Sequence, residues 1–162
     1  VNQVGGQDDL IFDGSSFVVD DHGNTICRLQ KFVEEVALID IKITQKNERD
    51  TSRNFAVISS QVQRTLAIEQ PKVLQDLDRS SELWSALVLA TRDYVQKNAF
   101  TDVVVGLSGG IDSSLVAAIA VDAIGSDRVH GVSMPSRYSS KGSRSDAPVS
   151  YTHLTLPTTP YV

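Results

Sequence analysis

The stretch of sequence that decides the fold is residues 102–125, which read DVVVGLSGGIDSSLVAAIAVDAIG. Residues 102–105 contain three consecutive valines, a short apolar run of β-branched side chains that is typical of a buried parallel strand. Residues 112–124 favour a helix that ends at Gly125, and residues 129–134 predict a second strand. This order predicts an α/β fold, a βαβ unit with a glycine-rich turn at the carboxyl end of its first strand, where open α/β sheets bind ligands.

The turn between the first strand and the helix has the composition of an anion site. Ser108, Gly109 and Gly110 lack bulky side chains, so their backbone N–H groups can approach an anion closely. The helix that follows adds free N–H groups and the positive end of its dipole. The hydroxyl groups of Ser108, Ser113 and Ser114 can donate hydrogen bonds to the same oxygens. We therefore expect this turn to bind a phosphate or a pyrophosphate.

Asp112 follows the turn directly, and its carboxylate would repel a bound phosphate. A divalent cation between the two groups removes this repulsion, and Mg²⁺ commonly bridges one or two carboxylates to the phosphates of a substrate. The sequence therefore predicts that Asp112 is a metal ligand and that the metal is Mg²⁺.

Other loop types compete with this interpretation, and a plain tight turn without a ligand also stays open. A Walker-A phosphate loop ends in Gly-Lys-Ser/Thr, whereas residues 110–113 read GIDS, and a dinucleotide-binding G-x-G-x-x-G is absent. Residues 106–110 match the nucleophile elbow of α/β-hydrolases, G-x-S-x-G, which would make Ser108 a nucleophile. A hydrolase also needs a later histidine, and the chain offers His130, inside a predicted strand, and His153.

Residues 80–98 predict a helix in front of the first strand of this unit. Ser80 or Ser81 can cap the helix, and Glu82 lies in its first turn, where a negative charge is favourable. Apolar residues recur at helical spacing and are expected to form the buried face: Leu83, Leu87, Ala90, Tyr94 and Val95.

Residues 1–43 predict β structure. Two β-branched runs within residues 17–29 flank a turn-forming Asp-His-Gly-Asn sequence and predict a hairpin. A further short strand is expected at residues 36–41. Residues 44–79 are rich in polar side chains, with only a weak helical pattern at 57–68, and predict a linker between two units.

The composition excludes several classes of protein. The chain has 162 residues, of which 41% are hydrophobic, enough to bury the core of one ordinary domain. Its 15 basic and 20 acidic residues give a net charge of -5, so we expect no nucleic acid partner. No apolar run approaches the roughly 20 residues of a membrane span, so we expect no membrane partner. The single cysteine, Cys27, excludes an intramolecular disulfide and favours a reducing, cytoplasmic setting.

Four segments of the chain resemble one enzyme family. Residues 108–113, SGGIDS, resemble the S-G-G-x-D-S loop of the N-type ATP pyrophosphatases, which include NAD, GMP, asparagine and argininosuccinate synthetases. On either side, residues 87–95, LVLATRDYV, and 131–140, GVSMPSRYSS, look like the synthetase domain of the glutamine-dependent NAD synthetases. Residues 2–16, NQVGGQDDLIFDGSS, resemble the late strands of the nitrilase-type glutaminase domain that precedes the synthetase in that family. The resemblance covers residues 1 to about 147.

The resemblance implies a division of the chain into four segments. Residues 1–43 correspond to the C-terminal part of the glutaminase domain, 44–79 to the linker, and 80–147 to the N-terminal part of the synthetase domain, with an adenine-nucleotide α-hydrolase-like parallel sheet. Residues 148–162 depart from the family and look similar to translated adapter sequence, so we expect a non-native tail, with a natural loop as the alternative. Prolines in this tail forbid a regular helix: Pro148, Pro157 and Pro160.

The resemblance also implies a reaction and a set of binding residues. In the family, the carboxylate of nicotinic acid adenine dinucleotide attacks the α-phosphorus of ATP, pyrophosphate leaves, and ammonia from glutamine displaces AMP to give NAD. Asp112 would help to hold Mg²⁺, and Arg137 would contact a phosphate or the dinucleotide, unless it is a solvated loop residue. The residues that would bind the ATP phosphates are Gly106, Leu107, Ser108, Gly109, Gly110, Ile111, Asp112 and Ser113.

The family's Glu-Lys-Cys glutaminase triad lies before the segment that this chain resembles. Cys27 is therefore not the glutaminase nucleophile, and we expect a small buried or edge residue there, while His22 is expected to have no catalytic role. The first residue is not Met, so we expect the chain to be a piece of a longer enzyme. We expect this piece to be inactive because it holds neither the ammonia-producing triad nor a second substrate site, and we expect the intact enzyme to be a homo-oligomer. The alternatives are another amidotransferase with the same loop type, an α/β-hydrolase that uses Ser108, and a non-catalytic nucleotide-binding fragment.

Overall fold

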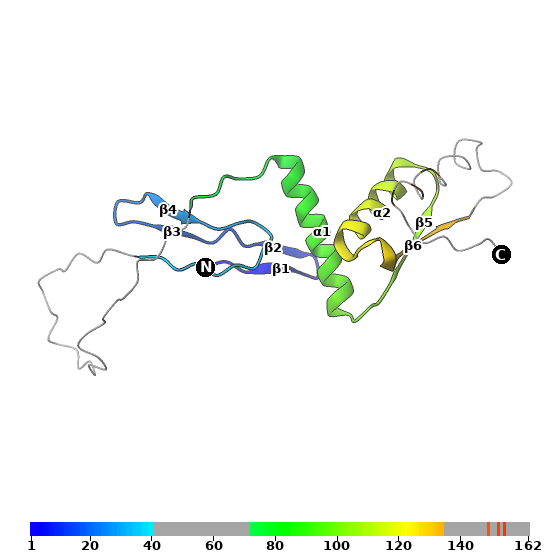
Figure 1. Ribbon diagram of the computed structural model, residues 1–162, viewed down its shortest axis with the longest axis horizontal. Coiled ribbons are helices and arrows are strands. Elements are labelled where there is room, and N and C mark those ends of the chain that lie inside the picture. The colour runs from blue at the N-terminus through cyan, green and yellow to red at the C-terminus, as the bar shows by residue number, and fades with distance from the viewer. Residues whose placement is uncertain (41–71, 135–148, 150–151, 153, 155–162) are drawn as a thin grey trace, which may run out of the picture.

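The computed structural model describes residues 1–40, 72–134, 149, 152 and 154. Helix α1 lies between the N-terminal strands and the second helix (Figure 1). The described elements are β1 (Val4–Gln7), β2 (Leu10–Asp13), β3 (Phe17–Val19), β4 (Thr25–Arg28), α1 (Arg79–Lys97), β5 (Val103–Leu107), α2 (Ile111–Ile124), the 3₁₀ turn η1 (Ser126–Arg128) and β6 (Val129–Ser133).

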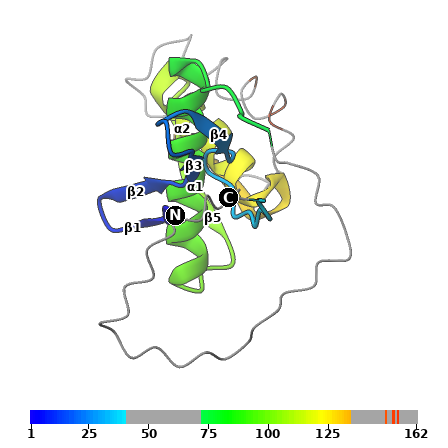
Figure 2. The same cartoon turned by 90° about the vertical axis from the view of Figure 1, so that its left-hand side faces the viewer.

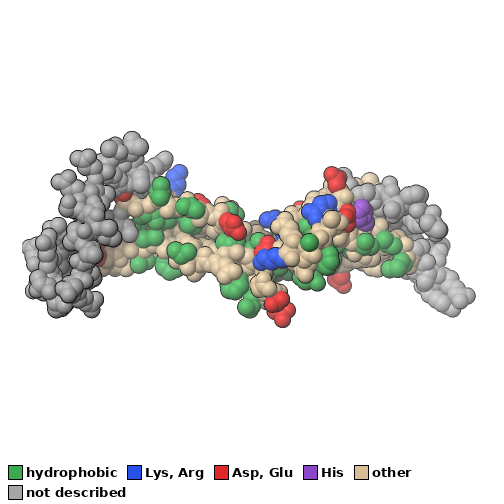
Figure 3. All heavy atoms as spheres, turned by 90° about the horizontal axis from the view of Figure 1, so that it is seen from below, with side chains coloured by type: hydrophobic (Ala, Val, Ile, Leu, Met, Phe, Trp, Pro, Cys, Tyr) green, Lys and Arg blue, Asp and Glu red, His purple; other side chains and the backbone are tan. Residues whose placement is uncertain are grey.

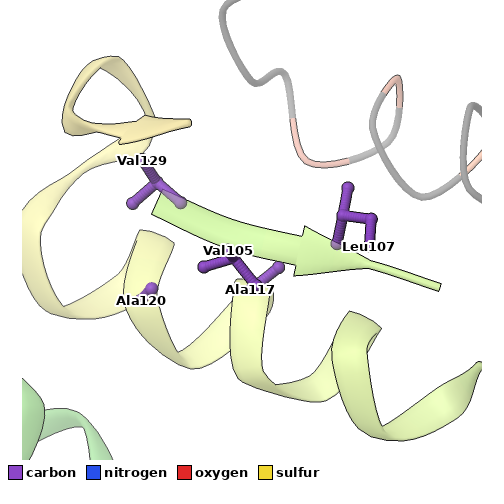
Figure 4. Packing of buried hydrophobic residues seen from close by; sticks show 5 residues of the cluster. All are labelled: Val105, Leu107, Ala117, Ala120 and Val129. Carbon is purple, nitrogen blue, oxygen red and sulfur yellow. The ribbon is translucent and has the colours of Figure 1, made fainter. Parts of the chain in front are cut away.

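Strands β5 and β6 are parallel and are joined by α2, so the predicted βαβ unit and the α/β fold are confirmed. The register runs from Val103 opposite Val129 to Leu107 opposite Ser133. Helix α2 packs on both strands. Its small side chains allow a close approach to the sheet, and Figure 4 shows the apolar cluster that results: Val105, Leu107, Ala117, Ala120 and Val129.

Helix α2 has the ends that the sequence predicts, to within one residue. It begins at Ile111 and ends at Ile124, and Gly125 forms the C-cap with a φ of 89°. The Gly125 N–H donates to the Val121 carbonyl at 2.8 Å, which satisfies one of the carbonyl groups left unpaired at the helix end.

Helix α1 differs from the prediction at its cap. The N-cap is Asp78, not Ser80 or Ser81, because its carboxylate accepts hydrogen bonds from the backbone N–H groups of both serines, at 3.0 and 3.1 Å. The Ser81 hydroxyl also donates to Asp78, and this hydrogen bond is the main reason that the pKa of Asp78 lies below its usual value. Glu82 lies in the first turn, as predicted.

The buried face of α1 also differs from the prediction. Its buried residues are Val88, Leu89 and Val95, whereas Leu83 and Tyr94 are more than 60% exposed. The helix contacts β1 as well as α2, so its buried surface is not the single stripe that the helical spacing indicates. Two hydrogen bonds hold α1 to α2. Trp84 Nε1 donates to Asp122 Oδ2 at 2.8 Å, and Arg92 Nε donates to the carbonyl of Ala123 at 3.1 Å.

The N-terminal region contains two antiparallel hairpins. Strands β3 and β4 form the hairpin predicted around residues 21–24, and strands β1 and β2 form a second one. Cys27 is 1% exposed on β4, which confirms the prediction of a small buried residue. The prediction of a strand at residues 36–41 is wrong over the described residues 36–40. No strand forms there, and the Val36 side chain is 91% exposed.

Several predictions fall on residues outside the described part of the chain. These are the helical pattern at residues 57–68, Arg137 and the three prolines of the tail themselves. The prediction that these prolines prevent a helix is wrong at Val149 and Thr152, the two described tail residues that are helical. At the end of the predicted linker, Val73 forms a β-bridge with Arg28. Hydrophobic side chains are spread over both halves of the visible surface (Figure 3), and Leu10, Leu83 and Val104 are each more than 60% exposed. Neither described helix is long and apolar enough to cross a membrane.

Candidate functional site

The glycine-rich turn joins the carboxyl end of β5 to the first turn of α2. Leu107 is 3% exposed and anchors the end of the strand in the apolar cluster, whereas the next residue, Ser108, is exposed. Gly109 has a φ of 80°, in the left-handed region that favours glycine. Gly110 is the N-cap of α2 in an extended conformation. The chain therefore passes from strand to helix within three residues, at the sheet edge where the sequence predicts a ligand site.

Serine side chains hold this turn in shape. The hydroxyls of Ser113 and Ser114 both donate to the carbonyl of Gly110, at 2.9 and 3.2 Å. The backbone N–H of Ser108 donates to Ser113 Oγ at 3.3 Å, and the two serine hydroxyl oxygens are 3.2 Å apart. The Gly110 N–H donates to Ser108 Oγ at 3.3 Å. The sequence predicts hydroxyls that face an anion, and the structure adds that they bond to the loop itself.

The first turn of α2 presents backbone donors to solvent. Gly110 supplies no side-chain cap, and the first N–H groups of an α-helix have no partner within the helix. The residues at this end are open, since Gly110 and Asp112 are exposed and Ile111 is 84% exposed. Uncapped N–H groups and the positive end of the helix dipole together favour an anion at this position.

Asp112 is exposed in the first turn of α2 and has no hydrogen bond or ion pair with the described residues. Within the described part of the chain, the group of three side chains with metal-ligand spacing is elsewhere, in the turn of the β3–β4 hairpin: Asp20, Asp21 and His22. The Asp20 carboxylate there already accepts hydrogen bonds from Asn24 and His22, and the Asn24 side chain is the main cause of its lowered pKa. Among the described residues, Asp112 is therefore the candidate carboxylate ligand for a metal at the loop.

The histidine that a hydrolase would need is not at this turn. His130 Nε2 lies 2.9 Å from Asp102 Oδ1, at the amino end of β5, while Ser108 follows the carboxyl end. A strand advances about 3.3 Å per residue, so the length of β5 separates the two sites by roughly 16 Å. Asp102 has a lowered pKa, mainly through a hydrogen bond from the Thr101 side chain and next through His130. No described histidine is placed to activate Ser108, which counts against the nucleophile elbow.

Comparisons with known proteins agree on one family. Residues 83–161 match the family model of NAD synthase. The glutamine-dependent NAD(+) synthetases of Acinetobacter baylyi and Synechocystis sp. are 44% and 45% identical to this chain, each over 91% of it. The structure of glutamine-dependent NAD+ synthetase from Acinetobacter baumannii in complex with adenosine diphosphate matches 96% of the chain, with a TM-score of 0.69 and 41% identity.

The chain belongs to the NAD synthetase family. It spans about a quarter of the length of these relatives, 24% for the Acinetobacter baylyi protein and 26% for the solved Acinetobacter baumannii chain. The resemblance found in the sequence is therefore confirmed. The family match runs to residue 161 and so includes residues 148–161. The predicted non-native tail at residues 148–162 stays a prediction.

Most of the predicted binding residues lie together, at the turn between β5 and α2. Ser108, Gly109 and Gly110 form the turn, and residues 111–113 form the first turn of α2. Gly106 and Leu107 lie in β5, where the Leu107 side chain belongs to the apolar cluster and not to an exposed site. Their roles in binding stay predictions.

Sequence reasoning missed the residues that connect the parts of the molecule. Arg92 contacts α2, and its neighbour Asp93 accepts a hydrogen bond from Gly6 of β1 at 2.8 Å. Lys97, one turn later, donates to the carbonyl of Gly6. The Gly5-Gly6 pair inside a strand is a signal that could have revealed this contact, because glycine within a strand often marks close approach of another segment.

Proposed function

We propose that this chain carries the ATP-phosphate site of a glutamine-dependent NAD(+) synthetase. The observation that supports this most directly is the uncapped start of α2, immediately after the Ser-Gly-Gly turn at the carboxyl end of a parallel strand. Such a helix start favours phosphate groups. Membership of the NAD synthetase family supports a nucleotide as the source of the bound phosphate groups. The structure of the Acinetobacter baumannii relative is a complex with adenosine diphosphate.

In the proposed reaction, the carboxylate of nicotinic acid adenine dinucleotide attacks the α-phosphorus of ATP and pyrophosphate leaves. Ammonia derived from glutamine then displaces AMP and gives NAD. The leaving pyrophosphate gains negative charge as its bond breaks, so the fixed backbone N–H groups of Gly109, Ile111 and Asp112 would stabilise the transition state without having to reorient. The serine hydrogen bonds described above keep the turn in this preorganised shape. We further propose that the full-length enzyme is a cytoplasmic homo-oligomer.

Mg²⁺ fits the residues present at this loop. It is commonly held by one or two protein carboxylates, with substrate phosphates and water as its other ligands. Asp112 is exposed, unpaired among the described residues and next to the proposed phosphate position, so it would be the carboxylate. The metal would supply positive charge that offsets the charge on the departing oxygens.

The binding proposal is tested by titrating the isotopically labelled chain with ATP and with pyrophosphate, in the presence of Mg²⁺. We expect the largest amide NMR shifts at residues 108–113. A lack of any shift at these amides, with shifts elsewhere or none, would refute the phosphate site.

The metal proposal is tested by Asp112→Asn in a full-length synthetase that carries this segment. Because metal stabilisation of a transition state is worth several kcal/mol, we expect kcat for NAD formation to fall by about 100-fold or more, while glutamine hydrolysis continues. An unchanged rate at saturating Mg²⁺ would show that the carboxylate is structural.

A further inference from the structure

Strand β1 meets helix α1 through the two polar backbone groups of a single residue. The Gly6 N–H donates to Asp93 Oδ2 at 2.8 Å, and the Gly6 carbonyl accepts from Lys97 Nζ. Asp93 and Lys97 are four residues apart on α1, and their charged atoms are 3.2 Å apart. β2 pairs with the other side of β1. The two helix side chains thus supply the acceptor and the donor that a neighbouring strand would supply to an edge strand.

This contact requires two glycines. Gly5 has a φ of 142°, and a Cβ placed on it would come within 3.0 Å of Asp93 Oδ2. A Cβ on Gly6 would come within 3.0 Å of the backbone Cα of Ala90, which cannot move without displacing α1. The strand therefore lies directly against the helix, and both views of the molecule show β1 beside α1 (Figure 2).

A second contact holds the N-terminal region to the first turn of the same helix. Lys31 Nζ lies 2.6 Å from Glu82 Oε1, and its pKa is raised, chiefly by this hydrogen bond. Glu82 and Asp93 are separated by about 16 Å along the helix, at 1.5 Å per residue. Two contacts at this spacing fix the direction of α1 relative to the hairpins as well as its position.

On its other side, α1 contacts α2, which begins directly after the glycine-rich turn of residues 108–110, here called the phosphate loop. Arg92 Nε donates to the carbonyl of Ala123, which is 7% exposed in the last turn of α2. Adjacent residues of α1 therefore bind different partners, Arg92 the end of α2 and Asp93 the strand β1. A displacement of the first turn of α2 would carry the last turn of the same helix with it and would so reach Arg92.

We propose that α1 couples the N-terminal hairpin to the phosphate loop, with Asp93 as the positioning residue toward β1 and Arg92 as the positioning residue toward α2. The coupling rests on the proposed function of the loop, because an anion bound at the start of α2 is the event that α1 would transmit. Its experimental signature is the exchange rate of the Gly6 amide hydrogen, a group that lies on β1 and not in the loop.

The test is amide hydrogen exchange by NMR on the 162-residue chain, with and without pyrophosphate and Mg²⁺. Pyrophosphate is expected to shift the amides of residues 108–113 and to slow exchange at Gly6 about fivefold, the lower end of measured couplings between sites. In Arg92→Gln, the loop amides should still shift but the Gly6 response should be lost, and Arg92→Lys, which keeps a donor, should restore part of it.

Variants at Asp93 test the contact without a ligand. Asp93→Ala should speed Gly6 exchange about tenfold or more, since a hydrogen bond to a charged group is lost. Asp93→Asn keeps an acceptor of the same reach and should restore most of the protection. Asp93→Glu keeps the charge, but its side chain is one methylene longer and would crowd Gly5. This variant should therefore not restore the protection of the Gly6 amide. Gln96→Ala, on an exposed part of α1, is the control and should change nothing.

Each result decides the proposal. Loop shifts with an unchanged Gly6 exchange rate in the wild type would overturn the coupling and leave the phosphate site standing. If pyrophosphate shifts no loop amide, the proposed function fails, and the coupling is judged without ligand: Arg92→Gln must then speed Gly6 exchange about fivefold. A rate unchanged in Asp93→Ala, or raised equally at Gly6 and at the buried Ala120 of α2, would show that Asp93 does not position β1.

Discussion

The βαβ unit of residues 103–133 and the two hairpins of residues 4–28 are stabilised by different interactions. The βαβ unit has its own apolar cluster, in which Ala117 and Val129 are fully buried. Within the described residues before α1, Cys27 is the one buried apolar side chain, and the other buried positions are glycines. The hairpins are held to α1 mainly by polar contacts such as Lys31 with Glu82 and Gly6 with Asp93. The βαβ unit therefore packs around a core of its own, whereas the hairpins rely on their contacts with the helix.

The largest expected effect concerns catalysis by the two regions together. The 162-residue chain spans about a quarter of its relatives, and its single cysteine is buried. We expect it to form no NAD from glutamine, ATP and nicotinic acid adenine dinucleotide in a coupled assay. The full-length Acinetobacter baylyi synthetase is the positive control. Measurable turnover by the chain alone would contradict this.

A buried charge in the βαβ unit should unfold it and spare the hairpins' local pairing. Ala117 is 0% exposed, and Ala117→Asp places an unpaired carboxylate in the apolar cluster, which should destabilise the unit by more than about 3 kcal/mol. Urea unfolding followed by circular dichroism measures this. Val116→Asp, at a neighbouring position that is 53% exposed, is the matched control and should have a small effect.

Ser108→Ala in a full-length synthetase distinguishes a loop ligand from a nucleophile. One hydrogen bond to a charged phosphate is worth roughly 1.5–3 kcal/mol, so ATP use should weaken by about 10- to 150-fold and some activity should remain. Loss of a covalent nucleophile would remove on the order of 10⁶ in kcat. Ser126→Ala changes a serine outside the loop and should leave ATP use unchanged. Stoichiometric labelling of Ser108 by a fluorophosphonate would support the hydrolase instead.

The smallest expected effect is at the cap of α1, the helix that both regions share. Asp78 has a lowered pKa, so its stabilising contribution is present above the ordinary value of 3.8 and is lost as the pH falls through the lower, folded-state pKa. Asp78→Ala should therefore lower the Tm at neutral pH, and the difference from the wild type should vanish in acid. Ser80→Ala should change the Tm less, because the Ser80 backbone N–H, not its hydroxyl, makes the capping bond.

The βαβ unit could be predicted from the sequence because its signals are local. An apolar run, two glycines and an alanine-rich helix identify strand, turn and helix without knowledge of the rest of the chain. The cap of α1 could not be assigned in this way, since Asp78, Ser80 and Ser81 all satisfy the same preference and only geometry chooses among them.

Features that depend on a distant partner were not predictable. Residues 36–40 have the composition of a strand, but a strand also needs a neighbour, and Val36 and Leu38 have none and are exposed. The position of the turn between β5 and α2 was predicted correctly from the sequence. The hydrogen bonds from Ser113 and Ser114 to Gly110 depend on side-chain geometry that a single sequence does not encode. Likewise, the contact of Gly6 with Asp93 joins residues 87 positions apart.

The hydrogen bond between Trp84 and Asp122 gives the molecule an optical reporter of its own. Trp84 is the single tryptophan of the chain, so the indole emission comes from one known place, the junction of α1 with α2. If the helices separate, the indole loses its carboxylate partner and enters water, and its fluorescence maximum should move to longer wavelength. Stopped-flow mixing with a nucleotide can therefore time the movement of these helices with no dye and no labelling step.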